Sequence, residues 1–347
     1  MGKGGGLKVE RFAGAAAEWD AFARAQPGWT HFHQHGWKDL IEQVYGHECV
    51  YLAARDGLGQ LAGVLPLVRV KSLVFGHYLV SMPFLNYGGP LGTDEGIRAV
   101  TDEACRLADS AGAKLLELRS RVALPLDLPV SHRKITVVLD LPEGRDPARL
   151  WQALGSKLRS QVKRPQKEGL EVRFGPDEVE PFFRIFARHM RDLGTPAQPR
   201  ALFDALSRHF GDSVWFGCAY FGDEPTAAGC GFRWGDEFEM TWASALSSYK
   251  RLAPNMLLYW AFMDRAVREG LRTFNFGRCT PGAGTHHFKR QWGSRDEPLW
   301  WYQHSAGGGA STPSPDAGAY ALGAMAWKRL PLAVATALGP RIVRLIP

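Results

Sequence analysis

Apolar and polar stretches follow one another in a similar order twice along the chain. Apolar residues at 50–54 and 61–68 flank a Gly-containing turn and predict a β-hairpin. Residues 214–220 and 227–234 repeat this pattern around a second turn. Because Pro66 has no amide hydrogen, the second strand of the first hairpin is expected at a sheet edge or at a bulge.

Each hairpin is followed, further along the chain, by a helix, a glycine and a short strand. The first helix is expected at 98–111 and its strand at 115–118. The second helix is expected at 255–269 and its strand at 273–276. Similar order at a spacing of about 160 residues favours a duplicated α/β module. The alternative is that such common units recur by chance.

The duplication predicts two domains in this chain of 347 residues. The join is expected in a turn-rich segment, so that the first domain covers residues 1–141 and the second covers 142–304. A Gly/Ser/Pro linker follows at 305–318. The remaining tail, 319–347, is apolar and basic and contains no acidic residue.

Composition indicates a globular protein of a reducing compartment. The five cysteines are widely spaced without a CxxC motif, so neither a disulfide framework nor a zinc site is expected. The histidines within 31–35 lack a nearby acidic partner, and no metal site is expected. Without a signal-peptide core or a run of about 18 apolar residues, a cytoplasmic location is expected. The net charge of +7 fits phosphate-bearing substrates, RNA, an anionic membrane surface or solubility alone.

The strongest candidate chemistry lies at 277–292. Here a strand ends in a loop rich in Gly, Thr and Pro, and Arg278 and Lys289 supply cations. Backbone N–H groups and fixed cations of this kind can meet a phosphate, a carboxylate or a developing oxyanion. The helix that begins near Asn255 adds free N–H groups, with Asn255 as its N-cap, and capping alone is the alternative.

Other segments carry weaker signals. Five cations within 156–167 indicate a phosphate or RNA contact, although a solvated helix face explains them equally well. At a helix end, Asp192 is placed to orient a cation or an amine, and ordinary C-terminal capping by Arg188 and Arg191 is the alternative. Tyr87 lies in an aromatic, Gly-rich turn and is a candidate wall of a cleft.

Short motifs are spread over nearly the whole chain, at residues 32–37, 84–90, 117–121, 157–161, 255–260, 275–278 and 289–293. Together they resemble the motifs of the FemAB-like proteins. The branch they match is the one associated with exosortase/PEP-CTERM and exopolysaccharide gene clusters.

This resemblance implies two tandem GNAT-like domains, in agreement with the duplication, and a final helix that packs back on the first domain. Family members of known activity transfer an aminoacyl group from aminoacyl-tRNA to an amine of a cell-wall precursor peptide, and related domains are acetyltransferases. The family pattern Asp-Phe-Gly-Arg appears here with Asn275 in the acidic position. The acyl-CoA signature of ordinary GNAT enzymes is absent before Asn255.

The expected protein is therefore an α/β acyltransferase with two tandem GNAT-like domains and a C-terminal helical tail. It is expected to transfer an acyl or aminoacyl group to an amine of a cell-envelope, glycan or peptide precursor in the cleft between the domains. No tightly bound cofactor is expected, and acyl-CoA or aminoacyl-tRNA is the phosphate-bearing co-substrate. A non-catalytic binder of a lipid-linked glycan or envelope precursor is the alternative. The tail is a candidate contact with the inner membrane surface, with docking inside the protein as the alternative.

The expected catalytic residues are Lys289, Arg278 and Asp192. Lys289 is expected to offset oxyanion or phosphate charge, and Arg278 to hold a phosphate. Asp192 and Glu239 are the candidates for a general base, and substrate-assisted proton transfer is the alternative. The expected substrate-binding residues are Tyr87, Arg188, Trp242, Ser244, Asn255, Tyr259, Asn275, Thr280, Thr285 and His286.

Overall fold

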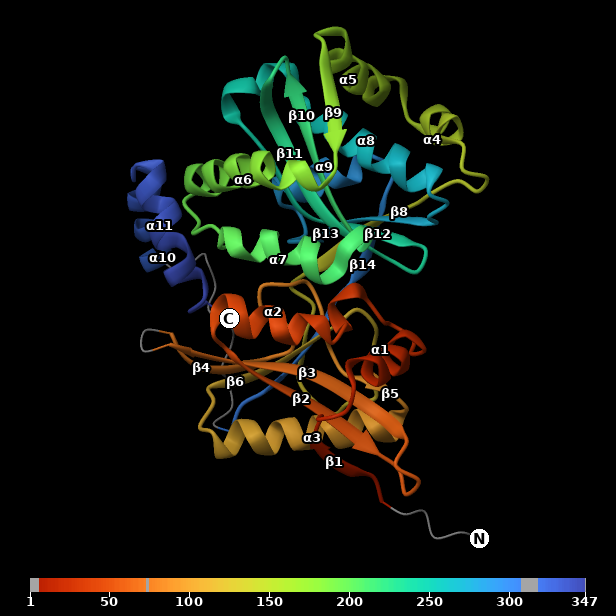
Figure 1. Cartoon of the computed structure of the whole chain (residues 1–347), viewed down its shortest axis with the longest axis vertical. Helices are drawn as coiled ribbons and strands as arrows, with labels where there is room; N and C mark the ends of the chain where they lie inside the picture. The colour runs from red at the N-terminus through yellow and green to blue at the C-terminus, as the bar shows by residue number, and fades with distance from the viewer. Residues whose placement is uncertain (1–5, 73–74, 307–317, 347) are drawn as a thin grey trace. The chain divides into compact units, whose positions relative to one another are not determined.

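The computed structural model describes residues 6–72, 75–306 and 318–346, and the chain forms two compact units (Figure 1). The first unit consists of residues 1–133, 298–314 and 344–347, and the second of residues 134–297 and 315–343. Each unit is built around its own β-sheet.

The first sheet has the strand order β1-β2-β3-β4-β6-β15-β7, and β5 pairs with β3. Its one parallel pair among the described strands is β4 with β6. The strands are β1 (Lys8–Arg11), β2 (Glu48–Arg55), β3 (Leu61–Ser72), β4 (Gly76–Val80), β5 (Leu91–Gly92), β6 (Leu115–Ser120), β7 (Val130–Ser131) and β15 (Trp300–His304). The helices are α1 (Ala16–Arg24), α2 (Gly36–Tyr45) and α3 (Asp94–Ser110). Helix α3 begins where the Thr93 hydroxyl accepts the N–H of Gly96 at 3.1 Å.

The second sheet has the strand order β14-β8-β13-β12-β11-β10-β9. The strands are β8 (Ile135–Asp140), β9 (Leu170–Phe174), β10 (Val214–Phe221), β11 (Glu224–Trp234), β12 (Glu237–Ala245), β13 (Thr273–Cys279) and β14 (Arg295–Pro298). The helices are α4 (Pro147–Ala153), α5 (Ser156–Lys167), α6 (Val179–Leu193), α7 (Arg200–Phe210), α8 (Pro254–Arg268), α9 (Gly284–Arg290), α10 (Gly318–Lys328) and α11 (Leu332–Val343).

The two sheets repeat one topology, and this accounts for the similar order seen in the sequence. Taken from β9 to β14, the second sheet matches the first taken from β1 to β7, with the parallel pair at the same place in both. The sixth place in each sheet is filled by a strand from the other copy: β15 in the first sheet and β8 in the second. Each of the two duplicated modules therefore contributes one strand to the sheet of the other.

The exchange moves the domain boundary from its expected place at residue 141. Strand β8, expected as the end of the first domain, pairs with β13, where Thr136 lies opposite Arg278. Strand β15, expected in the second domain, pairs with β6. The boundary lies between Arg133 and Lys134 because long-range backbone pairing, and not sequence order, assigns these strands.

Strand β3 is an interior strand, whereas Pro66 predicted either an edge position or a bulge. It pairs with β2 along one side, with Tyr51 opposite Pro66. On its other side, the register with β5 ends at Val64 and the register with β4 begins at Val68. Pro66 falls in the interval between these two partners, so a residue without an N–H is accommodated there.

The second sheet buries apolar side chains on both faces. Trp215 of β10 stacks on Phe238, with ring centres 4.4 Å apart, in the core beneath α8. The next residue, Phe216, contacts Phe182 of α6 at 5.4 Å. Because successive side chains of a strand point to opposite faces, α8 and α6 cover opposite faces of the sheet.

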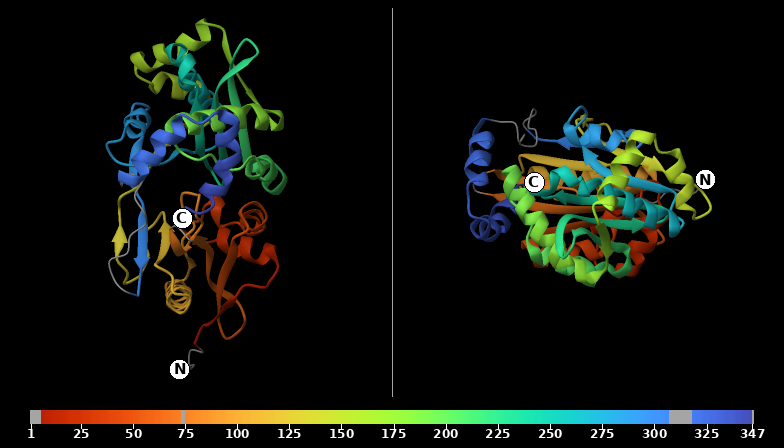
Figure 2. Two further views of the ribbon diagram at one scale, coloured as in Figure 1. Left: turned by 90° about the vertical axis from the view of Figure 1, so that its left-hand side faces the viewer. Right: turned by 90° about the horizontal axis from the view of Figure 1, so that it is seen from above.

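The tail forms α10 and α11, which pack against α6 of the second unit (Figure 1 and Figure 2). The Arg191 guanidinium donates to the carbonyl oxygen of Leu330 at 3.0 Å. A Cβ at Gly194 would lie 2.6 Å from the carbonyl oxygen of Ala324, so a glycine is needed for this approach. The expected packing of the tail on the first domain is thus corrected for α10 and α11, because the end of α6 supplies the donor and the space, while residues 344–347 belong to the first unit.

Much of the expected linker, residues 307–317, lies outside the described residues. Across the described ranges, no helix is both long enough and apolar enough to cross a membrane.

Candidate functional site

The parallel strands β12 and β13 part in the middle of the second sheet. Their pairing ends where Glu239 lies opposite Asn275, while β12 continues along β11 to Ala245. The register with β11 shifts just beyond this point and leaves Thr241 as a β-bulge. A bulge bends its strand, and β12 therefore turns away from β13.

A cavity of about 250 Å³ lies beside the end of β12. It is lined by β12, by the last turn of α6, by the first turns of α8 and by α9. The lining residues are His189, Ala243, Ser244, Ala245, Asn255, Leu258, Tyr259, Gly284, Thr285, Phe288 and Lys289. Five of them were expected from the sequence. Because pockets that bind drug-sized ligands measure roughly 300–1,000 Å³, the smaller volume of this cavity suits an acyl or aminoacyl arm better than a whole nucleotide.

Lys289 supplies a buried cation to this cavity, with 7% of the residue exposed. Its Nζ donates to the carbonyl oxygens of Gly277 at 2.7 Å and Arg278 at 3.1 Å. Gly277 has φ +75°, a conformation that favours glycine and that turns the end of β13. Burial lowers the pKa of Lys289 to about 8, because desolvation disfavours the charged ammonium. The lysine is therefore a cation at neutral pH that titrates in the weakly alkaline range.

Tyr259 places a phenol in the same cavity. Its ring lies 4.9 Å from that of Phe288 and 5.7 Å from that of Phe276, which fixes its orientation. Burial raises the pKa of Tyr259 well above its ordinary value. The group is thus a neutral hydroxyl donor at physiological pH.

The Asn275 side chain is buried and hydrogen-bonded to its neighbours, and it does not line the cavity, contrary to its expected role in substrate binding. Its Nδ2 donates to the carboxylates of Glu237 at 2.8 Å and Glu239 at 3.3 Å. Its Oδ1 accepts from the Thr136 hydroxyl at 2.6 Å and from the N–H of Gly277 at 2.8 Å. The two acidic side chains of β12 account for an amide at position 275, because a third buried carboxylate beside them would be repelled.

The start of α8 differs from the expected N-cap at Asn255. The N-cap residue is Ala253, in a left-handed conformation with φ +52°, and Pro254 is the first helical residue. Pro254 has no N–H, and the N–H of Met256 donates to Ala253 at 3.0 Å. Fewer N–H groups are therefore available for a phosphate here than the sequence predicts.

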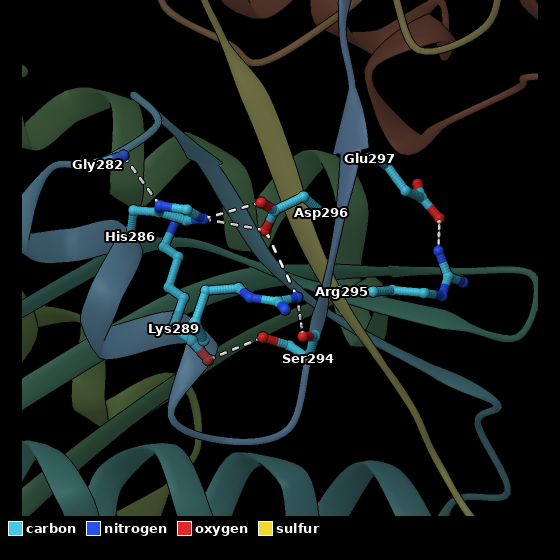
Figure 3. Close-up of polar contacts among 8 residues, drawn as sticks. Gly282, His286, Lys289, Ser294, Arg295, Asp296 and Glu297 are labelled. Carbon is cyan, nitrogen blue, oxygen red and sulfur yellow. Dashed lines mark hydrogen bonds and ion pairs between the residues drawn. The ribbon is translucent and has the colours of Figure 1, made fainter.

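His286, expected to bind substrate, holds the α9 segment together (Figure 3). The N–H of Gly282 donates to its Nδ1 at 3.0 Å, and its Nε2 lies 3.0 Å from each carboxylate oxygen of Asp296. Since Nδ1 accepts, Nε2 carries the hydrogen and donates to Asp296. The Ser294 hydroxyl adds a hydrogen bond to the carbonyl oxygen of Lys289 at 2.9 Å. These bonds position the short helix that carries the lysine.

The other expected site residues do not line the cavity. Trp242, just after the bulge, contacts Phe203 with ring centres 5.3 Å apart. Asp192 accepts a hydrogen bond from its neighbour Arg191 at 2.7 Å and is exposed. The remaining residues are Arg188, exposed on α6; Arg278, half-buried on β13; Thr280, which accepts from Lys134 at 2.6 Å; Glu239, fully buried; and Tyr87, buried in the first unit.

His189 also lines the cavity, although no pattern in the sequence predicted it as a site residue. The residue lies one position from Arg188 in a segment that we interpreted as a helix cap. Its alignment with the end of β12 depends on how α6 packs on the sheet, and a local pattern does not carry that information. Phe288, also missed, borders the cavity beside Lys289.

Comparisons with known proteins bear on this geometry. Residues 156–290 match the model of a family described as an acetyltransferase (GNAT) domain. This segment runs from α5 to the end of α9 and includes every residue that lines the cavity. No curated protein sequence matches the chain.

Solved structures share the fold of the chain at low sequence identity. FemX is 13% identical over 85% of this chain and 97% of its own, with a TM-score of 0.62. The C-terminal domain of a putative lysylphosphatidylglycerol synthetase from Agrobacterium fabrum is 13% identical over 89% and 95%, with a TM-score of 0.57. L-PGS from Bacillus licheniformis is 12% identical over 100% and 99%, with a TM-score of 0.56.

These similarities confirm the expected α/β fold class. Residues 156–290 match an acetyltransferase (GNAT) domain model, and the fold of the chain is similar to that of FemX.

Proposed function

We propose that this chain transfers an acyl or aminoacyl group to an amine, and that the acyl carbon binds in the cavity beside Lys289. The observation that carries the proposal is a buried ammonium group in a small cavity of a GNAT domain. When an amine attacks an acyl carbon, negative charge develops on the carbonyl oxygen, and a fixed cation in a dry site stabilises that charge. Two N–H groups of Lys289 bond to backbone carbonyls, and its third donor is not committed to any described residue.

Hydroxyl groups around the lysine fit the same reaction. Ser244, Tyr259 and Thr285 each contribute a hydroxyl to the cavity lining. Such groups orient a polar acyl arm, and the apolar side chains of Leu258 and Phe288 exclude water beside them. We propose that the acceptor is a primary amine of a cell-envelope, glycan or peptide precursor, the acceptor class that the resemblance of the sequence motifs to FemAB-like proteins implies.

We propose a phosphate-bearing carrier for the acyl group, either acyl-CoA or aminoacyl-tRNA. GNAT domains generally use acyl-CoA. Here, however, Pro254 removes an N–H from the helix start where a phosphate would bind. Helix α5 favours RNA: it exposes four cations on one face and forms no ion pair among the described residues. These cations are Lys157, Lys163, Arg164 and Lys167.

A transfer assay tests the proposal and identifies the carrier. The full chain is incubated with an amine-bearing envelope precursor and either radiolabelled acyl-CoA or radiolabelled aminoacyl-tRNA. We expect label to enter an amide product from one of the two donors, the one whose carrier the protein binds. K157E/K163E/K167E should reduce transfer from tRNA by about tenfold or more, because it removes cations that would contact RNA phosphates. Transfer from CoA should stay unchanged, because these three side chains do not line the cavity. If neither donor is consumed, the chain is a binder that kept the fold without the chemistry.

We also propose that the outer face of the tail contacts an anionic membrane surface. Met325, Val334 and Leu338 of α10 and α11 are 54%, 40% and 38% exposed. Lys328, Arg329 and Arg341 are exposed beside them, and 319–347 contains no acidic residue. Apolar side chains flanked by cations suit the boundary of an anionic bilayer. The inner face of the same helices is docked on α6, where Trp327 is buried.

Flotation with lipid vesicles tests this contact. The full chain should float with vesicles that contain anionic phosphatidylglycerol and far less with neutral phosphatidylcholine vesicles. M325S/V334S/L338S should lower the bound fraction about tenfold or more, because each apolar side chain contributes of the order of 1 kcal/mol on burial. L58S, which alters an 84% exposed leucine of the first unit, is the matched control. Equal flotation of the triple variant and the wild type would contradict the contact.

A further inference from the structure

We infer that His189 is the general base of the transfer, and this inference rests on the function proposed above. Its Nδ1 lies 3.0 Å from the carbonyl oxygen of Ala245, the last residue of β12. A carbonyl oxygen can only accept, so Nδ1 carries the hydrogen of the neutral ring. The lone pair of the neutral imidazole is therefore on Nε2.

His189 belongs to the cavity in which we propose that the acyl carbon binds. His189 is half-buried and lines the cavity together with Lys289, Tyr259 and Thr285. Its Nε2 has no hydrogen-bond partner within the described part of the chain, whereas both ring nitrogens of His286 are occupied. Of these two histidines, His189 is the one that lines the cavity and combines a fixed tautomer with an available acceptor nitrogen.

The fold orients the ring in the way that a base requires. Helix α6 brings the residue to the end of β12 near its own C-terminus, and the Ala245 carbonyl lies beyond the point where β12 has left β13. A base that is hydrogen-bonded through one nitrogen is held in the correct tautomer and orientation for proton transfer through the other. Neither Asp192, which bonds to Arg191, nor the buried Glu239, which bonds to Asn275, lines the cavity.

The acceptor amine nitrogen forms a bond to the acyl carbon, and its proton passes to Nε2 of His189. The carbon–oxygen bond of an aminoacyl ester, or the carbon–sulfur bond of a thioester, then breaks. The leaving alkoxide or thiolate takes that proton from the imidazolium and departs as a hydroxyl or thiol, so the ring ends neutral. Lys289 stays charged throughout and offsets the oxyanion.

Two substitutions of His189 test this role on the full chain. H189N retains an amide N–H near the position of Nδ1 and lacks Nε2, while H189A removes the ring. We expect H189N to lower kcat about 10²- to 10⁴-fold, as loss of a general base does, with the donor Kd within twofold of the wild type. Imidazole added to H189A should restore turnover at least tenfold, because the free base enters the vacated space. H209N, at an exposed histidine of α7, is the matched control and should keep wild-type turnover.

The outcomes separate this inference from the proposed function. If the wild type transfers label and H189N retains more than half of its kcat, His189 is not the base. If H189A is not rescued by imidazole and its donor Kd rises in parallel, the residue only shapes the cavity and the inference is wrong. If the wild type transfers no label from either donor, the proposed function itself fails. Thermal unfolding midpoints establish that each variant is folded, and H189Q replaces H189N if the latter is not.

Discussion

Lys289→Gln should lower the turnover of acyl transfer about a hundred- to a thousandfold, as loss of an oxyanion donor typically does. The substitution removes the ammonium group and keeps an N–H donor for the carbonyl oxygens of Gly277 and Arg278. The fold around α9 should therefore survive. Steady-state transfer with a labelled donor gives kcat, and K71Q at an exposed lysine of β3 is the control. Full turnover by Lys289→Gln would remove the lysine from the mechanism.

The same lysine should impose a pH dependence on the reaction. Its pKa, lowered by burial to about 8, means that the ammonium prevails below pH 8 and the neutral amine above it. Since the charged form stabilises the oxyanion, the ratio of wild-type to Lys289→Gln turnover should fall as pH rises through about 8. Ionisation of the acceptor amine affects both proteins and cancels in this ratio. A ratio that rises above pH 8 would instead indicate that the neutral amine acts as a base.

Asn275→Asp should lower the free energy of unfolding by roughly 2–5 kcal/mol at pH 7, the second large effect that we predict. The substitution replaces a buried amide that donates to Glu237 and Glu239 with a carboxyl group that faces two carboxylates. It also removes the hydrogen bonds that join β13 to β12 at the point where the strands part. Urea unfolding followed by circular dichroism measures the change.

N255D provides a matched control for this stability prediction. Asn255 is half-buried in the first turn of α8, where a negative charge interacts favourably with the helix dipole. Its substitution should leave stability unchanged or raise it slightly. The loss in Asn275→Asp should shrink at acidic pH, because protonation of the introduced carboxyl removes the repulsion. Equal stability of Asn275→Asp and the wild type at pH 7 would show that the two glutamates do not need the amide donor.

Local patterns account for the elements and for part of the site. The helix expected at 255–269 is α8, and the strand expected at 273–276 begins β13 at the predicted residue. Ser244, Asn255, Tyr259, Thr285 and Lys289 were expected at the site, and the structure brings them to one cavity. This part was accessible because the helix, strand, loop and lysine are close in sequence, so their mutual positions follow from short connections.

The sequence by itself indicated that the chain repeats one α/β module and that a Gly/Thr-rich loop with Arg278 and Lys289 follows the strand of the second copy. Only the tertiary structure decided that β8 belongs to the second sheet and β15 to the first. It likewise decided that the tail helices pack on α6 and that His189 of α6 contacts the end of β12. It also decided that Asn275 serves two glutamates and not a substrate. The physical reason is common to all four: each depends on backbone pairing or packing between residues far apart in sequence, and hydrophobic periodicity specifies which face of an element is buried but not against which partner.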